Sequence, residues 1–110
     1  MIHHQTDGKG PPILLLNGIA MTAVSWDVVA RPLAKTYRVI RCDFRGQLMT
    51  PALPPDNVAE HADHVDGLLD DLGIDSAHIV GTSFGGVIGT LVASRHPDRV
   101  RSLITIASAD

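Results

Sequence analysis

The twelve residues from His78 to Gly89 constrain this chain more than any other stretch, because they spell HIVGTSFGGVIG. A short apolar run leads into Gly81-Thr82-Ser83-Phe84-Gly85, and a second apolar segment starts at Val87. This order predicts a strand, a sharp turn and a helix with Ser83 at the apex, and the turn fits the pattern G-x-S-x-G. We call this turn, Gly81 to Gly85, the elbow. So tight a turn brings the backbone close to the residues two before and two after the serine. Only glycine leaves room at positions 81 and 85.

The pattern by itself has two interpretations. In the first, it is a glycine-rich turn between a strand and a helix, and the serine only caps the helix. In the second, Ser83 is a nucleophile whose hydroxyl stands clear of the sheet, while the first N–H groups and the positive dipole end of the helix face the reacting centre. The flanking apolar segments favour the nucleophile, since they are the context that the motif requires.

Length and composition narrow the classes of protein to consider. A chain of 110 residues forms one domain at most. The net charge of −3, with both signs interspersed, gives no reason to expect nucleic acid or a membrane surface as a partner. We find no pattern of a signal peptide or a membrane span, so we expect a cytoplasmic protein. Cys42 is the single cysteine and is expected to be a small buried residue.

The rest of the chain alternates between predicted strands and helices. Strands are expected at Met1–Thr6, Ile13–Leu16, Tyr37–Cys42 and Val100–Ile106, and helices at Ser25–Leu33, at Val58–Leu72 and from the elbow to Arg95. This alternation predicts an α/β fold with a mainly parallel sheet and helices on both faces. Ser25 is a plausible N-cap of the first helix.

The helix at Val58–Leu72 is the clearest of the three. Asn57 with Glu60 three residues later is typical of a capped N-terminus, and Gly73 suits the C-terminal end. Its acidic residues are expected on a solvated face rather than in a metal site; they are Asp63, Asp66, Asp70 and Asp71. His61 and His64 are also expected to be solvated.

In a parallel sheet the conspicuous loops gather at the carboxyl edge, where open α/β sheets bind ligands. Asn17-Gly18-Ile19-Ala20 follows one strand, Asp43-Phe44-Arg45-Gly46 follows the next, and Ser83 follows the third. A serine that attacks a carbonyl carbon needs N–H donors aimed at the developing oxyanion. The loop after the first central strand and the residue after the serine can supply these donors.

Together these features resemble the N-terminal portion of the α/β-hydrolase fold family, over nearly the whole chain. Asn17-Gly18 stands where the family has a histidine-glycine signature, and Trp26 matches a tryptophan often found in the following helix. Asp43-Phe44-Arg45-Gly46 looks like the family's D-x-R-G turn, although Gln47-Leu48 replaces the usual continuation. The stretch from Arg95 to Val100 is similar to the family's segment after the nucleophile helix.

The resemblance implies the roles of the site residues. The backbone N–H groups of Ile19 and Phe84 would form the oxyanion hole. The supporting turns would be made by Asn17, Gly18, Gly81 and Gly85. Neither a cofactor nor a metal is implied.

The nucleophile narrows the chemistry that the resemblance implies. Relatives that cleave carbon–halogen bonds or epoxides carry an aspartate at the elbow, whereas Ser83 indicates esters, lactones, thioesters or activated carbon–carbon bonds. The chain looks most like small carboxylesterase or enol-lactonase-type members. We therefore expect a serine hydrolase that acts on a small ester-like or lactone molecule through an acyl-enzyme on Ser83. An acyltransferase or a cofactor-free haloperoxidase-like activity would use the same site and stays open.

The sequence contains no suitable acid and base for this serine. In this fold the triad runs Ser, Asp or Glu, then His along the chain, and no histidine follows Asp98. His96 lies at the far end of the nucleophile's helix, and a helix of about twelve residues is about 18 Å long. None of the other histidines is expected at the serine; they are His3, His4, His61, His64 and His78.

We therefore expect residues 1–110 to be the N-terminal part of a single α/β-hydrolase domain, an incomplete core that is inactive alone. A second polypeptide segment would then pair with the apolar strand at Val100–Ile106 and bring the acid and the histidine. The alternative is a non-catalytic α/β fragment or binding module that retains the elbow for folding.

Overall fold

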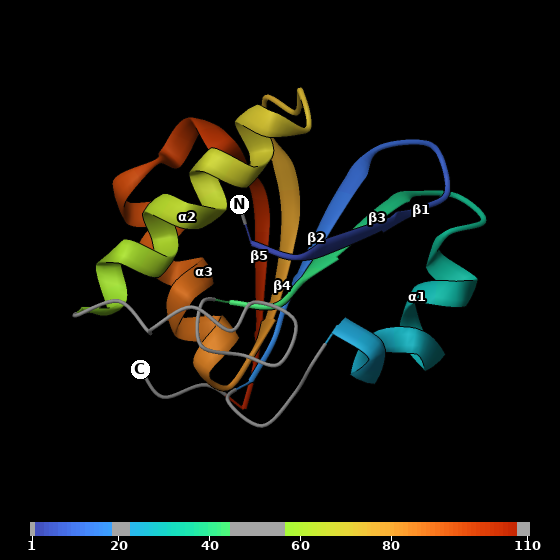
Figure 1. Cartoon of the computed structure of the whole chain (residues 1–110), viewed down its shortest axis with the longest axis horizontal. Coiled ribbons are helices and arrows are strands. Elements are labelled where there is room, and N and C mark those ends of the chain that lie inside the picture. Colours follow the sequence, from blue (N-terminus) through green and yellow to red (C-terminus); the bar gives the residue numbers. More distant parts are fainter. Residues whose placement is uncertain (1, 19–22, 45–56, 108–110) are drawn as a thin grey trace.

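A computed structural model of the chain describes residues 2–18, 23–44 and 57–107. One five-stranded sheet lies between helices on its two faces (Figure 1). The strands are β1 His4–Asp7, β2 Pro12–Leu16, β3 Arg38–Cys42, β4 Ala77–Thr82 and β5 Val100–Ile106. The α-helices are α1 Asp27–Leu33, α2 Val58–Asp71 and α3 Phe84–Arg95, and short 3-10 helices are η1 Ala23–Trp26 and η2 Pro97–Arg99.

The sheet has the strand order β1-β3-β2-β4-β5. β1 runs antiparallel to β3, and all the other neighbouring strands are parallel. The predicted α/β class with a mainly parallel sheet is therefore confirmed. Leu16 at the end of β2 pairs with Gly81 of β4, so the register places the exit of β2 beside the elbow.

Each face of the sheet has its own apolar core, because successive strand residues point to opposite sides. Leu14 and Leu16 of β2 face α2 and α3, within a cluster that includes Val65 and Ile88. On the opposite face, residues of β2 and β3 pack with Trp26 and the α1 residue Ala30. β2 is therefore buried on both sides, as its continuous apolar run predicts.

The two predicted helix starts have different outcomes. The side chain of Asn57 accepts a hydrogen bond from the Glu60 N–H at 3.1 Å, so the predicted cap of α2 is confirmed. The predicted Ser25 cap of the first helix is wrong, because Ser25 lies inside η1 and Trp26 takes the N-cap position of α1 without a side-chain cap bond. The indole N–H of Trp26 instead donates a buried hydrogen bond to the side-chain oxygen of Asn17.

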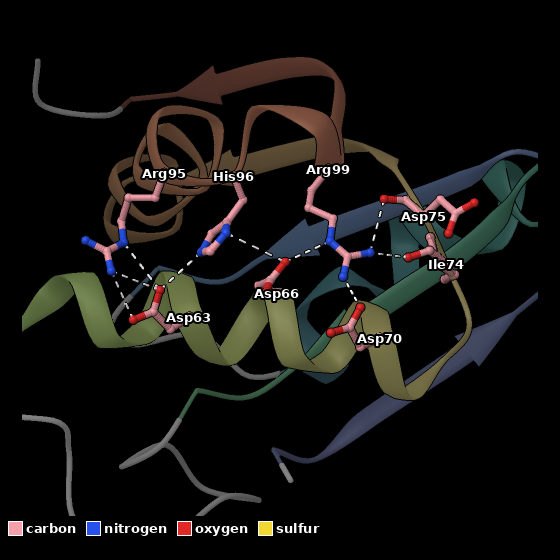
Figure 2. Close-up of polar contacts among 8 residues, drawn as sticks. All are labelled: Asp63, Asp66, Asp70, Ile74, Asp75, Arg95, His96 and Arg99. Carbon is pink, nitrogen blue, oxygen red and sulfur yellow. Dashed lines mark hydrogen bonds and ion pairs between the residues drawn. The ribbon is translucent and has the colours of Figure 1, made fainter.

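The acidic residues of α2 are mostly exposed, as expected, and three of them also form ion pairs that the sequence did not predict. Figure 2 shows Asp63, Asp66 and Asp70 in a row that faces basic side chains at the end of α3 and in η2. Asp63 pairs with Arg95 at 3.2 Å and with His96 at 3.1 Å. These two partners, His96 first, hold the pKa of the Asp63 carboxyl below its ordinary value.

Arg99 is the least exposed of the basic side chains in this row. Its Nε donates to Asp66 at 2.7 Å, and it also pairs with Asp70. A further guanidinium N–H of Arg99 donates to the carbonyl of Ile74 at 2.8 Å (Figure 2). The charge run therefore joins α2 to the C-terminal end of α3, which helps to fix the helix that begins at the elbow.

Candidate active site

Ser83 lies at the sharp turn between β4 and α3 and has an unusual backbone conformation. Its φ is 51° and its ψ is −115°, and the residue is exposed. Among the described residues, Ala107 is the other non-glycine residue with a positive φ. Such a conformation costs free energy for a residue with a side chain, and it occurs mainly at functional sites. The predicted strand, turn and helix are present, with the serine at the apex.

Steric contacts explain the glycines that flank Ser83. A Cβ atom on Gly81 would lie 2.3 Å from the carbonyl oxygen of Gly85. A Cβ atom on Gly85 would lie 2.2 Å from the carbonyl oxygen of Leu16 and 2.7 Å from that of Asn17. The expectation that only glycine fits at both positions is confirmed. The second contact also packs the elbow directly against the exit of β2.

Backbone hydrogen bonds hold the turn in place, so that the N-terminal end of α3 begins directly after Ser83. The Ser83 N–H donates to the Ile106 carbonyl at 2.8 Å, which ties the elbow to β5. The Ser83 carbonyl accepts from Gly86 at 2.9 Å and from Val87 at 3.3 Å. Phe84 precedes both donors as the first residue of the helix, and the first N–H groups of a helix have no intrahelical acceptor. The oxyanion role of its N–H stays a prediction.

A buried amide fixes the start of the other predicted oxyanion loop. Asn17 is fully buried, and its Nδ2 donates to the Cys42 carbonyl at 2.7 Å and to Asp43 Oδ1 at 3.1 Å. Its Oδ1 accepts a hydrogen bond from the Trp26 indole at 2.7 Å. One neutral side chain thus joins the exits of β2 and β3 to η1. Gly18 is buried beside it, whereas Ile19, the predicted donor, lies outside the described residues.

Cys42 is not a competing nucleophile. Burial, with a smaller contribution from the nearby Asp43 carboxylate, raises the pKa of its thiol to about 12. The thiol is therefore neutral near pH 7, and a neutral thiol is a poor nucleophile. The expectation of a buried, inert cysteine agrees with this position at the end of β3.

A serine–histidine contact does occur in the described residues, but away from the elbow. His78 Nδ1 lies 2.7 Å from Ser102 Oγ, between β4 and β5. His78 is near the start of β4, whereas Ser83 follows its end. Ser102 also sits within β5, next to a register shift in the β4–β5 pairing, and has neither the strained turn nor the helix start that accompanies Ser83. This pair provides a natural control for experiments on Ser83.

The histidines of α2 and α3 differ in their surroundings. His96 follows the last residue of α3 and contacts Asp63 and Asp66, as expected for the end of that helix remote from Ser83. The expectation that His61 is solvated is wrong, because it is only 7% exposed. Its spacing from Val65 and Leu68 matches the buried stripe of α2, and this periodicity could have identified it.

The described residues give no support for a metal centre or a membrane span. Within residues 2–18, 23–44 and 57–107, no group of three or more histidine, cysteine or acidic side chains could hold a metal ion. Over the same residues, no helix has both the length and the apolar character needed to cross a bilayer.

The family follows from the whole pattern of strand, elbow and helix. A model of the alpha/beta hydrolase fold matches residues 11–110. The chain belongs to the α/β-hydrolase family. It is 41% identical to 2-hydroxymuconate semialdehyde hydrolase from Pseudomonas sp. (strain CF600). The alignment extends over 107 residues and covers 93% of this chain and 38% of that protein.

Solved structures show the same fold. A hydrolase from Pseudomonas aeruginosa PA01 has a TM-score of 0.92 and 32% identity, over 96% of this chain and 41% of that one. The enol-lactonase from Burkholderia xenovorans LB400 has a TM-score of 0.87 and 32% identity, over 93% of this chain and 41% of that one. This α/β-hydrolase chain therefore spans about two fifths of the length of these relatives.

The contact of Gly85 with the Leu16 carbonyl predicts a strong effect of a single methyl group. Gly85→Ala is expected to lower the free energy of unfolding by about 3 kcal/mol or more, because a backbone atom has to move. Gly67→Ala is the matched control: Gly67 lies inside α2 and a Cβ atom there meets nothing within 4 Å. Gly67→Ala should stabilise by about 0.5–1 kcal/mol. Urea unfolding of each variant measures both changes in stability, and equal effects would contradict the steric explanation.

The Asn17 amide predicts an energetic coupling between two loops. Asn17→Ala removes the acceptor of the Trp26 indole and the donor to the Cys42 carbonyl, so a loss of about 2–4 kcal/mol is expected. Trp26→Phe removes the indole donor and leaves a smaller ring in the core, so it should cost at least about 1–2 kcal/mol. A double-mutant cycle by urea unfolding should show that the two losses overlap. Strictly additive losses would show that the amide does not couple these loops.

Proposed function

We propose that Ser83 is the nucleophile of a serine hydrolase that acts on a small ester-like or lactone substrate. In this proposal the Ser83 oxygen attacks the substrate carbonyl carbon, and the serine proton passes through the general base to the alcohol oxygen as its bond to the carbonyl carbon breaks. Water then hydrolyses the resulting acyl-enzyme, which releases the carboxylic acid and restores the serine hydroxyl. The N–H groups of Ile19 and Phe84 stabilise the oxyanion of each tetrahedral intermediate. The proposal involves no metal and no cofactor.

The positive φ of Ser83 is the observation that carries this proposal. A serine that only capped α3 would be expected to sit in the extended region and to bond a helix N–H with its side chain. Ser83 instead has a φ of 51° and makes no side-chain cap bond. The relatives named above are hydrolases, and the enol-lactonase among them supports an ester or lactone rather than an unrelated substrate class.

The general base and its acid belong, in our proposal, to a segment that follows β5. The chain spans 38% of the semialdehyde hydrolase, so most of that relative lies outside the match. β5 is at the edge of the described sheet, and its Ile104 and Ile106 are 55% and 48% exposed. An apolar edge strand of this kind favours pairing with another segment. We propose that the segment that follows β5 pairs with this edge strand and brings a histidine to Ser83. Residues 1–110 alone are then inactive.

A fluorophosphonate probe tests the nucleophile in the full-length protein. Covalent labelling is expected at Ser83, and Ser83→Ala should abolish both labelling and hydrolysis of an activated ester such as p-nitrophenyl acetate. Ser102→Ala is the matched control, because Ser102 is the serine paired with His78. It should retain labelling and turnover within about twofold, since it removes no group of the proposed site.

Two outcomes would contradict Ser83 as the nucleophile, and a third would contradict hydrolysis as the reaction. Labelling that is lost in Ser102→Ala but kept in Ser83→Ala would place the nucleophile on β5. A folded full-length protein with no labelling and no ester hydrolysis would favour the alternative, a non-catalytic α/β domain that retains the elbow for folding. Transfer of the acyl group to an acceptor other than water would instead indicate an acyltransferase at the same site.

A further inference from the structure

Three aromatic rings from separate parts of the chain meet behind the elbow. Phe44 follows the end of β3, His61 lies in the first turns of α2, and Phe84 is the first residue of α3. The His61 ring centroid lies 5.2 Å from that of Phe44 and 5.5 Å from that of Phe84. The two phenylalanine rings are 6.1 Å apart at an interplanar angle of 89°. We call these residues the ring cluster.

The ring cluster has the geometry of mutual edge-to-face contacts. His61 is perpendicular to Phe84, at 90°, and is inclined at 65° to Phe44. Phe44 and His61 are buried, at 1% and 7% exposure, and Phe84 packs against the same core. Contacts of this kind depend on ring orientation as well as on the area buried. An aliphatic side chain at position 61 could fill the space, but it would not orient the Phe84 ring.

Phe84 is held from two directions. Its neighbour Gly85 presses against the Leu16 carbonyl on the sheet side, and its ring meets His61 on the α2 side. Because the Phe84 N–H belongs to the peptide unit that joins Phe84 to Ser83, a shift of the Phe84 backbone would move this donor. Rotation of the ring alone would not move it, so the ring contacts act by holding the Phe84 backbone in place. A donor to an oxyanion stabilises a transition state only when its direction is fixed before the reaction.

We propose that His61 is a positioning residue for the hydrolytic reaction, which orients the Phe84 N–H through the ring cluster. This inference rests on the proposed function, in which that N–H binds the oxyanion. His61 touches neither the nucleophile nor the substrate in this role. It acts on the transition state through Phe84, so its loss lowers kcat and leaves KM nearly unchanged.

The test compares substitutions at position 61 in the full-length protein. His61→Leu removes the ring, and His61→Phe keeps an aromatic ring that is somewhat larger than imidazole. Val65→Ala is the matched control, since Val65 is a fully buried α2 residue of the same core that belongs to none of the ring contacts. The measurements are the rate of Ser83 phosphonylation, kcat and KM for an activated ester, and the urea midpoint of each variant.

His61→Leu is expected to lower kcat and the phosphonylation rate by about tenfold, less than the 10²- to 10³-fold loss that removal of a whole oxyanion donor causes. His61→Phe should restore both to within about threefold. Val65→Ala should lower the urea midpoint at least as much as His61→Leu does, without changing kcat. This combination separates positioning from general stability.

Different results overturn different claims. Equal kcat in His61→Leu and the unsubstituted protein would overturn the role of His61 while leaving Ser83 as the nucleophile. A loss of kcat in Val65→Ala that matches the loss in His61→Leu would show that general packing is responsible. If the unsubstituted protein shows no labelling at Ser83, the proposed function fails, and the role of the ring cluster fails with it.

Discussion

The rest of the site depends on the close contact between the backbone of Gly85 and the carbonyl oxygen of Leu16, which leaves no room for a side chain at position 85. A Cβ atom on Gly85 would be 2.2 Å from this oxygen, so the start of α3 packs backbone to backbone against the end of β2. The contact sets how far Ser83 projects from the sheet and how close the elbow comes to the loop after β2. The positive φ of Ser83 is the local cost of this geometry, and the buried core around β2 and β4 supports it.

The two predicted oxyanion elements are fixed by different interactions. On the β2 side, the neutral Asn17 amide joins two strand exits and the Trp26 indole without bringing another charge next to Asp43. On the α3 side, ring contacts of Phe84 and the ion pairs near its C-terminal end hold the helix. Both supports lie within the described residues. The described residues therefore hold the surroundings of both predicted oxyanion donors in place.

Much of this could be predicted from the sequence because the strongest constraints are local. The apolar run of β2 and the glycines at 81 and 85 predicted the sheet and the elbow, since burial and steric contact act on those residues directly. Charge and polarity were less informative: Asp63 is exposed as expected, but its pairing with Arg95 was not predicted, and His61, which was expected in solvent, is buried. Their surroundings depend on which helix packs beside α2, and local sequence does not specify that packing. Ile19 lies outside the described residues, so its role stays a prediction.

The central claim is that the strained turn holds a nucleophile, Ser83. Backbone N–H groups beside it would donate hydrogen bonds to the oxyanion of the tetrahedral intermediate. A crystal structure of the full-length protein with a phosphonate bound covalently to Ser83 tests it most directly. We predict that the phosphonyl oxygen lies at about 3 Å from the Phe84 nitrogen and from the Ile19 nitrogen. We also predict that a histidine from beyond residue 110 lies within hydrogen-bond distance of Ser83 Oγ. An adduct whose oxygen points into solvent, with neither nitrogen in reach, would contradict the account.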